Sequence, residues 1–370
     1  MTLLPSYTFN RVRADVQAMR AYQVQDAKQG QVKLDAMENP HRLPPELQAR
    51  LGQRLGALAL NRYPNGRIND LRHALAEYAN LPEGFDLILG NGSDELISLL
   101  ALAFAVMPSV ANNFKKPSVL APEPGFVMVA MSSRLQGLDF VGVPLTCNFE
   151  LDLPAMQDAI ALHQPAITYL AYPNNPTANL WNDAAIESVI GAVREQGGFV
   201  VIDEAYQPFA AKSYIDRLAQ HSHVLLLRTL SKFGLAGVRL GYLMGHKDLI
   251  AQIDKVRPPY NVSVLNCEAA LFALENKAVF EAQALDILAQ RAYIFDVLSQ
   301  CPHVHPYPSQ ANMILVRVPD AQKTFDCLVR RGILVKNVSK MHPLLANCLR
   351  LTVGTATENS QMLDALITTL

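Results

Sequence analysis

Short runs of Val, Ile and Leu recur along the chain, and segments long enough to form helices separate them. The runs lie at residues 85–89, 118–120, 166–170, 199–202 and 224–227. The intervening segments include 153–163 and 184–196. Short apolar strands that are buried on both faces and alternate with helices are typical of a mainly parallel sheet. The sequence therefore predicts an α/β fold.

The alternation of strands and helices stops around residues 258–260, where two prolines precede a tyrosine. A long segment rich in Ala, Leu, Glu and Gln, residues 264–298, follows and predicts helix. Further strands are predicted at 311–318, 333–336 and 348–353. A chain of 370 residues exceeds one typical domain. We expect an N-terminal arm over 1–35 that packs with the small domain or a partner subunit, a large domain over 36–264, and a small α+β domain over 265–370.

The composition argues against several classes of partner. A net charge of −1 provides no excess of Lys and Arg for binding nucleic acid or an acidic membrane surface. No secretory signal is visible, and no uncharged run reaches the roughly 18 residues that span a bilayer. The five cysteines form no C-x-x-C pair, which indicates reduced thiols, and the nine histidines form no H-E-x-x-H zinc motif. We expect a cytoplasmic protein that binds small molecules and no metal.

Polar residues follow several of the predicted strands. Residues 90–95 form a Gly-rich turn that opens a helix, and the free N–H groups of such a turn suit a phosphate. Ser93 or Asp94 could equally be an ordinary helix cap. Residues 172–177 form a turn held by two prolines, in which an Asn side chain could donate to an oxygen of a bound ring. A plain Asn-Pro turn is the alternative.

Two charged residues stand at the ends of apolar strands. Asp203 follows 200–202, where a carboxylate is costly unless a cation meets it. Lys232 follows 224–227 after a short polar segment. Out of water and beside other cations, the pKa of such a lysine falls, and its free amine can attack a carbonyl to form a Schiff base.

Taken together, these residues match what pyridoxal 5'-phosphate requires: a phosphate cradle, a ring-oxygen donor, a carboxylate for the ring nitrogen and a Schiff-base lysine. Arg239 could add a charge-assisted contact to the phosphate. A nucleotide-binding loop is the competing interpretation of residues 90–94. The chain has neither the G-x-x-x-x-G-K-[ST] nor the G-x-G-x-x-G pattern that such a loop needs, and it has no G-x-S-x-G nucleophile motif.

The chain resembles the fold-type I aminotransferases and, within them, the histidinol-phosphate aminotransferases. The resemblance runs over nearly the whole chain, through the motifs at 37–40, 63–64, 92–95, 175–177, 203–206, 229–232 and 349–355. It implies a fold-type I transferase dependent on pyridoxal phosphate, with a large mainly parallel-sheet domain and a smaller α+β domain. It also implies a homodimer with shared active sites.

The resemblance assigns roles to individual residues. Lys232 would form the Schiff base with the cofactor and then move the proton. Asp203 would pair with the pyridine nitrogen, and Asn175 and Tyr206 would bond the ring hydroxyl. Phe126 would stack on the ring. The residues implied to hold the phosphate are Ser93, Asp94, Ser231 and Arg239, with Tyr63 reaching over from the second subunit.

For the substrate, the resemblance implies that Arg350 takes the anionic end, because the planar fork of an arginine bonds two oxygens at once. An outward-facing residue in a salt bridge is the alternative for Arg350. The other implied pocket residues are Tyr22, Asn39 and Tyr260.

The chain departs from the family pattern at three places. The loop between Lys232 and Arg239 is one residue shorter than usual, which affects the geometry of Arg239. Ala178 follows the Asn-Pro-Thr motif where Gly is usual, a change that a turn with negative φ would tolerate. Lys336 stands where many relatives have an arginine near the substrate.

The implied reaction is the transamination of L-histidinol phosphate with 2-oxoglutarate to imidazole acetol phosphate and L-glutamate, in histidine biosynthesis. An aromatic or broad-range aminotransferase and a phosphothreonine decarboxylase of the same fold remain alternatives, because an arginine accepts either a carboxylate or a phosphate. A regulator that binds the cofactor without turnover is a third hypothesis. It is disfavoured because the N-terminal segment is too short and too neutral for a DNA-binding domain.

Overall fold

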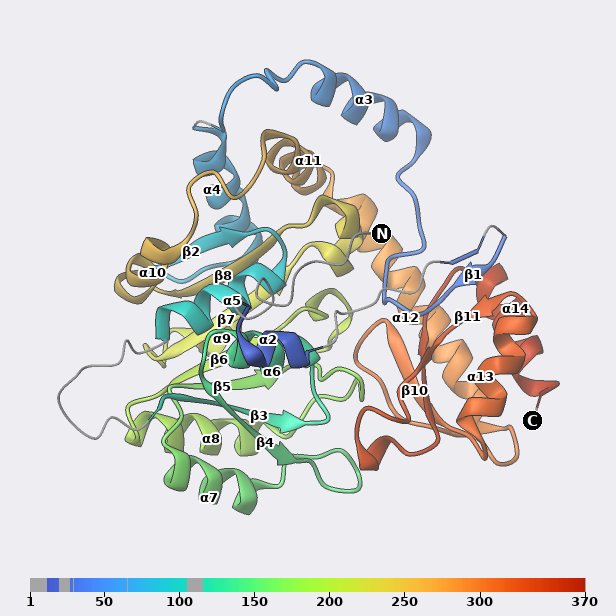
Figure 1. Cartoon of the computed structure of the whole chain (residues 1–370). Helices are drawn as coiled ribbons and strands as arrows, with labels where there is room; N and C mark the ends of the chain where they lie inside the picture. The colour runs from blue at the N-terminus through green and yellow to red at the C-terminus, as the bar shows by residue number, and fades with distance from the viewer. Residues whose placement is uncertain (1–11, 20–26, 29, 65, 105–115, 370) are drawn as a thin grey trace, which may run out of the picture.

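The computed structural model describes residues 12–19, 27–28, 30–64, 66–104 and 116–369. These residues form a large lobe around a seven-stranded sheet and a smaller lobe around a four-stranded sheet (Figure 1). No helix within the described ranges has the length and apolar character needed to cross a membrane.

The large sheet has the strand order β2-β8-β7-β6-β5-β3-β4. Its strands are β2 (Phe85–Gly90), β3 (Ser118–Glu123), β4 (Asp139–Pro144), β5 (Ile167–Ala171), β6 (Phe199–Asp203), β7 (Val224–Thr229) and β8 (Gly241–His246). Neighbouring strands from β4 to β7 pair in parallel, whereas β8 runs antiparallel to both β7 and β2. The predicted mainly parallel α/β sheet is confirmed.

Successive residues of the central strands face opposite sides of the large sheet, because side chains alternate along a strand. Val201 and Leu225 pack with α5 (Ser93–Phe104), α6 (Val127–Leu135) and α10 (Lys247–Ile253) on one side. Ile202 and Leu226 pack with α7 (Leu153–His163) and α8 (Asp183–Glu195) on the other. The strands are buried on both faces, which is why they appear in the sequence as continuous apolar runs.

The small lobe is built on an antiparallel sheet of order β12-β13-β10-β9. Its elements are α12 (Lys277–Ser299), β9 (His305–Pro306), β10 (Met313–Arg317), α13 (Ala321–Arg330), β12 (Lys336–Asn337), β13 (Cys348–Thr352) and α14 (Ala356–Ile367). β1 (Val32–Lys33) pairs in parallel with β11 (Ile333–Leu334), so residues 32–33 lie on the small lobe. The predicted strand at 333–336 is thus two short strands that belong to different sheets.

The helix expected over 264–298 is two helices, α11 (Val264–Glu275) and α12, which meet at Asn276. The side-chain amide of Asn276 donates to the Phe272 carbonyl at 2.7 Å and ends the first helix. α11 packs in the large-lobe core beside α4 (Arg67–Ala79), with α3 (Pro45–Gly56) next to it, whereas the later half of α12 packs in the small-lobe core. We therefore propose that the boundary between the domains lies within α12 rather than at residue 265.

The turn after the Asn-Pro-Thr motif does not have the negative φ that would tolerate an alanine without strain. Ala178 has φ +63°, although no glycine stands there. Ala178 N–H donates to the Asn174 carbonyl at 2.8 Å, and its carbonyl accepts from Gln310 N–H at 2.7 Å. These two hydrogen bonds hold the fully buried alanine in a backbone conformation that L-residues adopt at a cost of about 1–2 kcal/mol.

Substitutions at Ala178 test this conformation. Ala178→Val should lower the free energy of unfolding by more than about 2 kcal/mol, because a β-branched side chain is strained at positive φ and overfills a buried site. Ala178→Gly should change it by less than about 1 kcal/mol, because backbone relief offsets the lost methyl burial. Urea unfolding of both variants measures the difference. Equal stability of the two variants would contradict the positive φ.

Candidate active site

The carboxyl ends of β5, β6 and β7 open into a cavity of about 330 Å³, and the carboxyl ends of strands are where open α/β sheets bind ligands. The cavity also receives the start of α5 and residues 36–38. Nine of the predicted cofactor residues line it: Ser93, Asp94, Phe126, Asn175, Asp203, Tyr206, Ser231, Lys232 and Arg239. The fold therefore brings together residues that lie far apart in the sequence.

Lys232 lies in a turn just after β7, with its amine inside the cavity. Nζ donates to the Ala36 carbonyl at 2.9 Å. Burial, together with the nearby positive charge of Arg350, lowers the pKa of Lys232 to about 8. Two residues on, Gly234 has φ +140°, and a Cβ there would lie 2.7 Å from the ring of Phe280. The turn that presents the lysine therefore requires this glycine.

Asp203 ends β6 and is buried at the cavity wall. One oxygen, Oδ1, accepts from Ala205 N–H at 3.0 Å. Burial, with smaller contributions from the negative charges of Asp94 and Glu204, raises the pKa of Asp203 to about 7. A cationic ring nitrogen would remove this cost, so the carboxylate fits the pyridine nitrogen of pyridoxal 5'-phosphate.

The loop that carries Lys232, residues 230–240 between β7 and β8, is called the lysine loop. A site for an anion forms where the turn before α5 meets the end of this lysine loop. Arg239 Nη2 lies 3.1 Å from Asp94 Oδ2, and Nη1 lies 3.5 Å from Ser231 Oγ. Gly92 has φ +84°, and a Cβ there would lie 2.6 Å from Arg239 Nη2. The shorter loop therefore still brings Arg239 to the predicted phosphate residues, because Gly92 leaves room for the guanidinium.

Arg350 lies on β13 and is buried behind the Asn175 wall of the cavity. Its Nη1 donates to Asn175 Oδ1 at 2.8 Å and its Nη2 donates to the Asp35 carbonyl at 2.7 Å. Asn175 thus uses its amide oxygen for the arginine, which leaves its amide nitrogen as the donor for a ring oxygen. The arginine is therefore not the outward-facing surface residue that was the alternative.

Other predicted substrate residues do not line this cavity. The side-chain amide of Asn39 donates to the Phe233 carbonyl at 3.3 Å and to Gln283 Oε1 at 3.0 Å, so it joins the lysine loop to α12. Lys336 lies beside Arg350 in the register of β12 and β13 and is half-exposed. Tyr22 falls outside the described residues.

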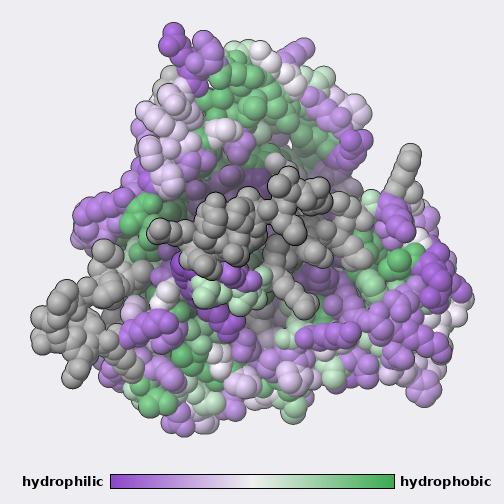
Figure 2. All heavy atoms as spheres, in the orientation of Figure 1, coloured by the Kyte–Doolittle hydropathy of each residue, from purple (hydrophilic) through white to green (hydrophobic). Residues whose placement is uncertain are grey.

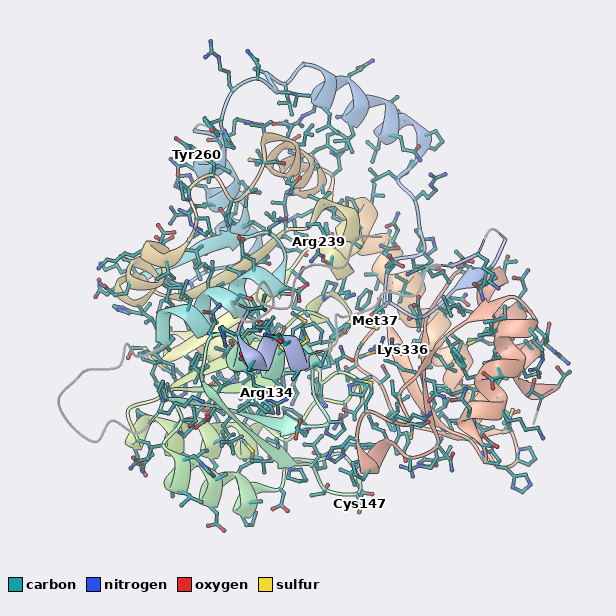
Figure 3. The ribbon with its side chains drawn as sticks, in the orientation of Figure 1. Met37, Arg134, Cys147, Arg239, Tyr260 and Lys336 are labelled. Atoms are coloured by element: carbon teal, nitrogen blue, oxygen red, sulfur yellow. The ribbon has the colours of Figure 1, made fainter. Side chains whose placement is uncertain are left out.

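Tyr63 and Tyr260 stack on each other with ring centroids 4.6 Å apart, outside the cavity of their own chain. Both are exposed, at 76% and 56%. Figure 3 shows Tyr260 far from Met37 and Lys336, on the upper part of the large lobe.

Sequence reasoning missed Met37, which forms part of the cavity wall. Met37 has φ +52°, and its N–H donates to Thr352 Oγ1 at 3.0 Å while its carbonyl accepts from Asn312 Nδ2 at 3.0 Å. A methionine with positive φ has no sequence signal, so only the long-range contacts could identify it.

A buried lysine, a buried carboxylate and an arginine-serine cradle at the edge of a mainly parallel sheet fit a site for pyridoxal phosphate. The family described as aminotransferase class I and II matches residues 29–367. The chain is 70% identical over 96% of its length, and 95% of the relative's, to the histidinol-phosphate aminotransferase of Polaromonas naphthalenivorans. It is 67% identical over 96% of its length, and 93% of the relative's, to that of Methylibium petroleiphilum.

Among solved structures, the fold matches the histidinol-phosphate aminotransferase of Sinorhizobium meliloti in complex with pyridoxal-5'-phosphate, with a TM-score of 0.82, 23% identity and 98% of each chain covered. The chain therefore belongs to aminotransferase class I and II and, within it, to the histidinol-phosphate aminotransferase family. The cofactor of this class is pyridoxal 5'-phosphate.

The environment of Lys232 makes its reactivity depend on pH. In cofactor-free protein, Lys232 should react faster with pyridoxal 5'-phosphate as the pH rises. The midpoint of this rate profile should lie near the lysine pKa of about 8. Arg350→Met should move the midpoint to higher pH, because removing a positive charge favours the protonated amine. Borohydride trapping followed by mass spectrometry measures the adduct. A midpoint at the ordinary lysine value in the unsubstituted protein would contradict the burial.

Proposed function

We propose that this protein transfers the amino group of L-histidinol phosphate to 2-oxoglutarate, giving imidazole acetol phosphate and L-glutamate. The observation that carries the proposal is the meeting of Lys232 and Asp203 in one cavity, with Arg239 at one end and Arg350 behind Asn175. The names of the relatives support the substrate, and the buried arginine supports an anionic group on it.

Bound pyridoxal phosphate supplies an electron sink for the charge that develops at the reacting carbon of the substrate. The Asp203 carboxylate would hold the ring nitrogen protonated. Burial raises the pKa of Tyr206 and keeps its hydroxyl protonated, so Tyr206 could donate a hydrogen bond to the ring oxygen. The amide nitrogen of Asn175 would donate to the same oxygen, and Phe126 would lie against the ring.

Lys232 would be both the residue that binds the cofactor carbonyl and the base that moves the proton. Its lowered pKa makes the neutral amine available near neutral pH, and burial keeps water from competing with it. The guanidinium of Arg239, the Ser231 hydroxyl and the turn at Ser93 and Asp94 hold the phosphate. We propose these roles for the residues that the cavity brings together.

The anionic ends of both substrates would meet Arg350. Its two bonded nitrogens, held by Asn175 and by the Asp35 carbonyl, fix the plane of the guanidinium. A guanidinium held in this way can donate hydrogen bonds to either a phosphate or a carboxylate. A ping-pong cycle with two unlike substrates needs this tolerance. Lys336 is the nearby cation that we propose as a second contact to a phosphate.

We also propose a homodimer in which Tyr63 and Tyr260 of each subunit complete the cavity of the other. The two stacked tyrosine rings are exposed to solvent in the single chain, although each carries a large apolar surface. Figure 2 shows hydrophobic side chains gathered over α3 and α11 on the same upper part of the molecule, where Leu60 and Leu265 are exposed. Contiguous exposed apolar surface of this kind marks an interaction site.

The free state of all five cysteines supports a cytoplasmic location.

The reaction can be tested with three amino donors. The ratio kcat/KM should be at least about 100-fold higher for histidinol phosphate than for phenylalanine or O-phosphothreonine, since a site built for one substrate loses binding energy with the others. Lys232→Ala should abolish turnover of all three. Coupled assays of glutamate formation and of CO₂ release distinguish transamination from decarboxylation. Equal or better turnover of phenylalanine or O-phosphothreonine would favour the alternative enzymes.

The shared site predicts complementation between two inactive or impaired proteins. In a mixed dimer of Lys232→Ala and Tyr63→Ala chains, one cavity receives both substitutions and the other receives neither. Equal mixing after reversible dissociation should therefore restore up to about a quarter of the activity of the unsubstituted dimer. Activity assays before and after mixing measure the recovery. No recovery beyond the Tyr63→Ala level would place Tyr63 outside the partner's site.

A further inference from the structure

A buried ion pair lies on the face of the large sheet opposite to the cavity. Glu204 directly follows Asp203 at the end of β6, and Arg228 is the next-to-last residue of β7. Arg228 Nε and Nη2 each lie 2.9 Å from Glu204 Oε2, and the side chains are 6% and 1% exposed. Because side chains alternate along a strand, Glu204 points away from the cavity side that Asp203 faces.

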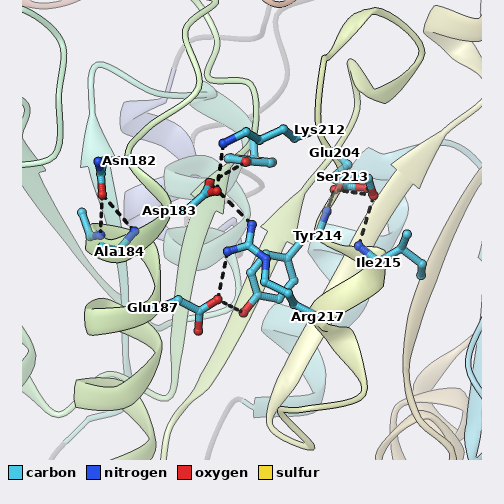
Figure 4. Close-up of polar contacts among 12 residues, drawn as sticks. Asn182, Asp183, Ala184, Glu187, Glu204, Lys212, Ser213, Tyr214, Ile215 and Arg217 are labelled. Carbon is cyan, nitrogen blue, oxygen red and sulfur yellow. Dashed lines mark hydrogen bonds and ion pairs between the residues drawn. The ribbon is translucent and has the colours of Figure 1, made fainter.

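The second carboxylate oxygen of Glu204 binds the loop that follows β6. Glu204 Oε1 accepts from the Ser213 hydroxyl at 3.0 Å and from the Tyr214 N–H (Figure 4). Arg228 Nη2 also donates to the Ser213 hydroxyl at 2.9 Å. Glu204 N–H donates to the Leu227 carbonyl at 2.8 Å. The pair therefore joins the end of β6, the end of β7 and residues 213–214 in one hydrogen-bonded unit.

Such a pair is a poor device for stability alone. Removing two charges from water costs free energy that their attraction offsets only with good geometry, and apolar side chains of similar size often stabilise a fold as well. What a two-point guanidinium-carboxylate contact adds is a fixed relative position of the parts it joins. Here those parts carry Asp203 on β6 and, four residues after Arg228, Lys232.

We propose that Glu204 and Arg228 are positioning residues, which hold the ends of β6 and β7 in the register that sets Asp203 and Lys232 at working distance in the cavity. Neither touches the cavity itself. The inference rests on the proposed function, because Asp203 and Lys232 are taken as the groups that act on the cofactor. A small displacement between two such groups is enough to slow a reaction strongly.

The test is the double variant Glu204→Gln/Arg228→Met. The glutamine oxygen can still accept from Ser213 and Tyr214, so the variant removes the side-chain link between the strand ends, keeps their backbone hydrogen bonds and leaves no unpaired buried charge. We expect its Tm to stay within about 3 °C of the unsubstituted protein. We expect kcat to fall by about 10- to 100-fold while KM for both substrates changes less than about threefold.

A readout without substrate separates this inference from the proposed function. Equilibrium dialysis measures the Kd of the cofactor-free protein for pyridoxal 5'-phosphate. This Kd should rise at least about tenfold in the double variant, because Asp203 is displaced from its position for bonding the ring nitrogen. A wrong substrate assignment would leave this result unchanged. Unchanged Kd and unchanged kcat, with the fold intact, would overturn the positioning role.

A control is the ion pair of Glu187 and Arg217, whose atoms Oε1 and Nη1 lie 3.1 Å apart (Figure 4). Arg217 comes three residues after Tyr214. The ion pair joins α8 to α9 (Ile215–Leu218) and does not include β6 or β7. Glu187→Gln/Arg217→Met should leave cofactor Kd and kcat within about twofold. An equal loss in this control would show that loop loosening, not strand register, causes the effect.

If Glu204→Gln/Arg228→Met does not fold, Arg228→Lys provides the comparison. It keeps the opposite charge but offers a compact ammonium in place of the guanidinium fork. We expect a fold like that of the unsubstituted protein, with kcat lowered at least about threefold and cofactor Kd raised by a similar factor. Full retention of both values would overturn the proposal, because charge alone would then suffice.

Discussion

The burial of Asp203 and Lys232 in one small cavity is the constraint on which the rest of the structure depends. Burial alone disfavours a charge on either group, raising the pKa of the acid and lowering that of the amine. A cofactor with a cationic ring nitrogen would stabilise the Asp203 carboxylate. Its carbonyl carbon would react with the neutral amine of Lys232. The parallel pairing of β6 and β7 places the two residues at the same edge of the sheet, so every element that keeps this pairing serves the site.

The two faces of that sheet edge have different tasks. On the cavity side lie the groups that act on ligands, and they include a guanidinium that fits only because Gly92 has no side chain. On the opposite side, Glu204 and Arg228 form a closed polar unit without access to the cavity. The small lobe adds Arg350, whose contact with the Asp35 carbonyl ties residue 35 to the same wall. The active site is therefore a product of both lobes.

Much of the chemistry was predictable because it resides in short local patterns. An apolar run that ends in Asp203 or leads to Lys232 identifies a strand end and a functional group together. The sequence did not predict the break at Asn276, since the helical period continues across it. Nor did it predict the positive φ of Ala178, where a local hydrogen bond to Asn174 and a long-range one from Gln310 override the backbone preference. Asn39 carries a family motif, yet its amide is occupied by Phe233 and Gln283.

The sequence by itself determined the α/β class, the residue types of the cofactor site and their order along the chain, because hydrophobic period and turn chemistry act over a few residues. Only the tertiary structure decided which of those residues share a cavity, that Asn175 is bonded to Arg350, and that Tyr63 and Tyr260 lie exposed outside the cavity of their own chain. The physical reason is that strand register and packing between lobes depend on contacts between distant residues, which no local pattern encodes.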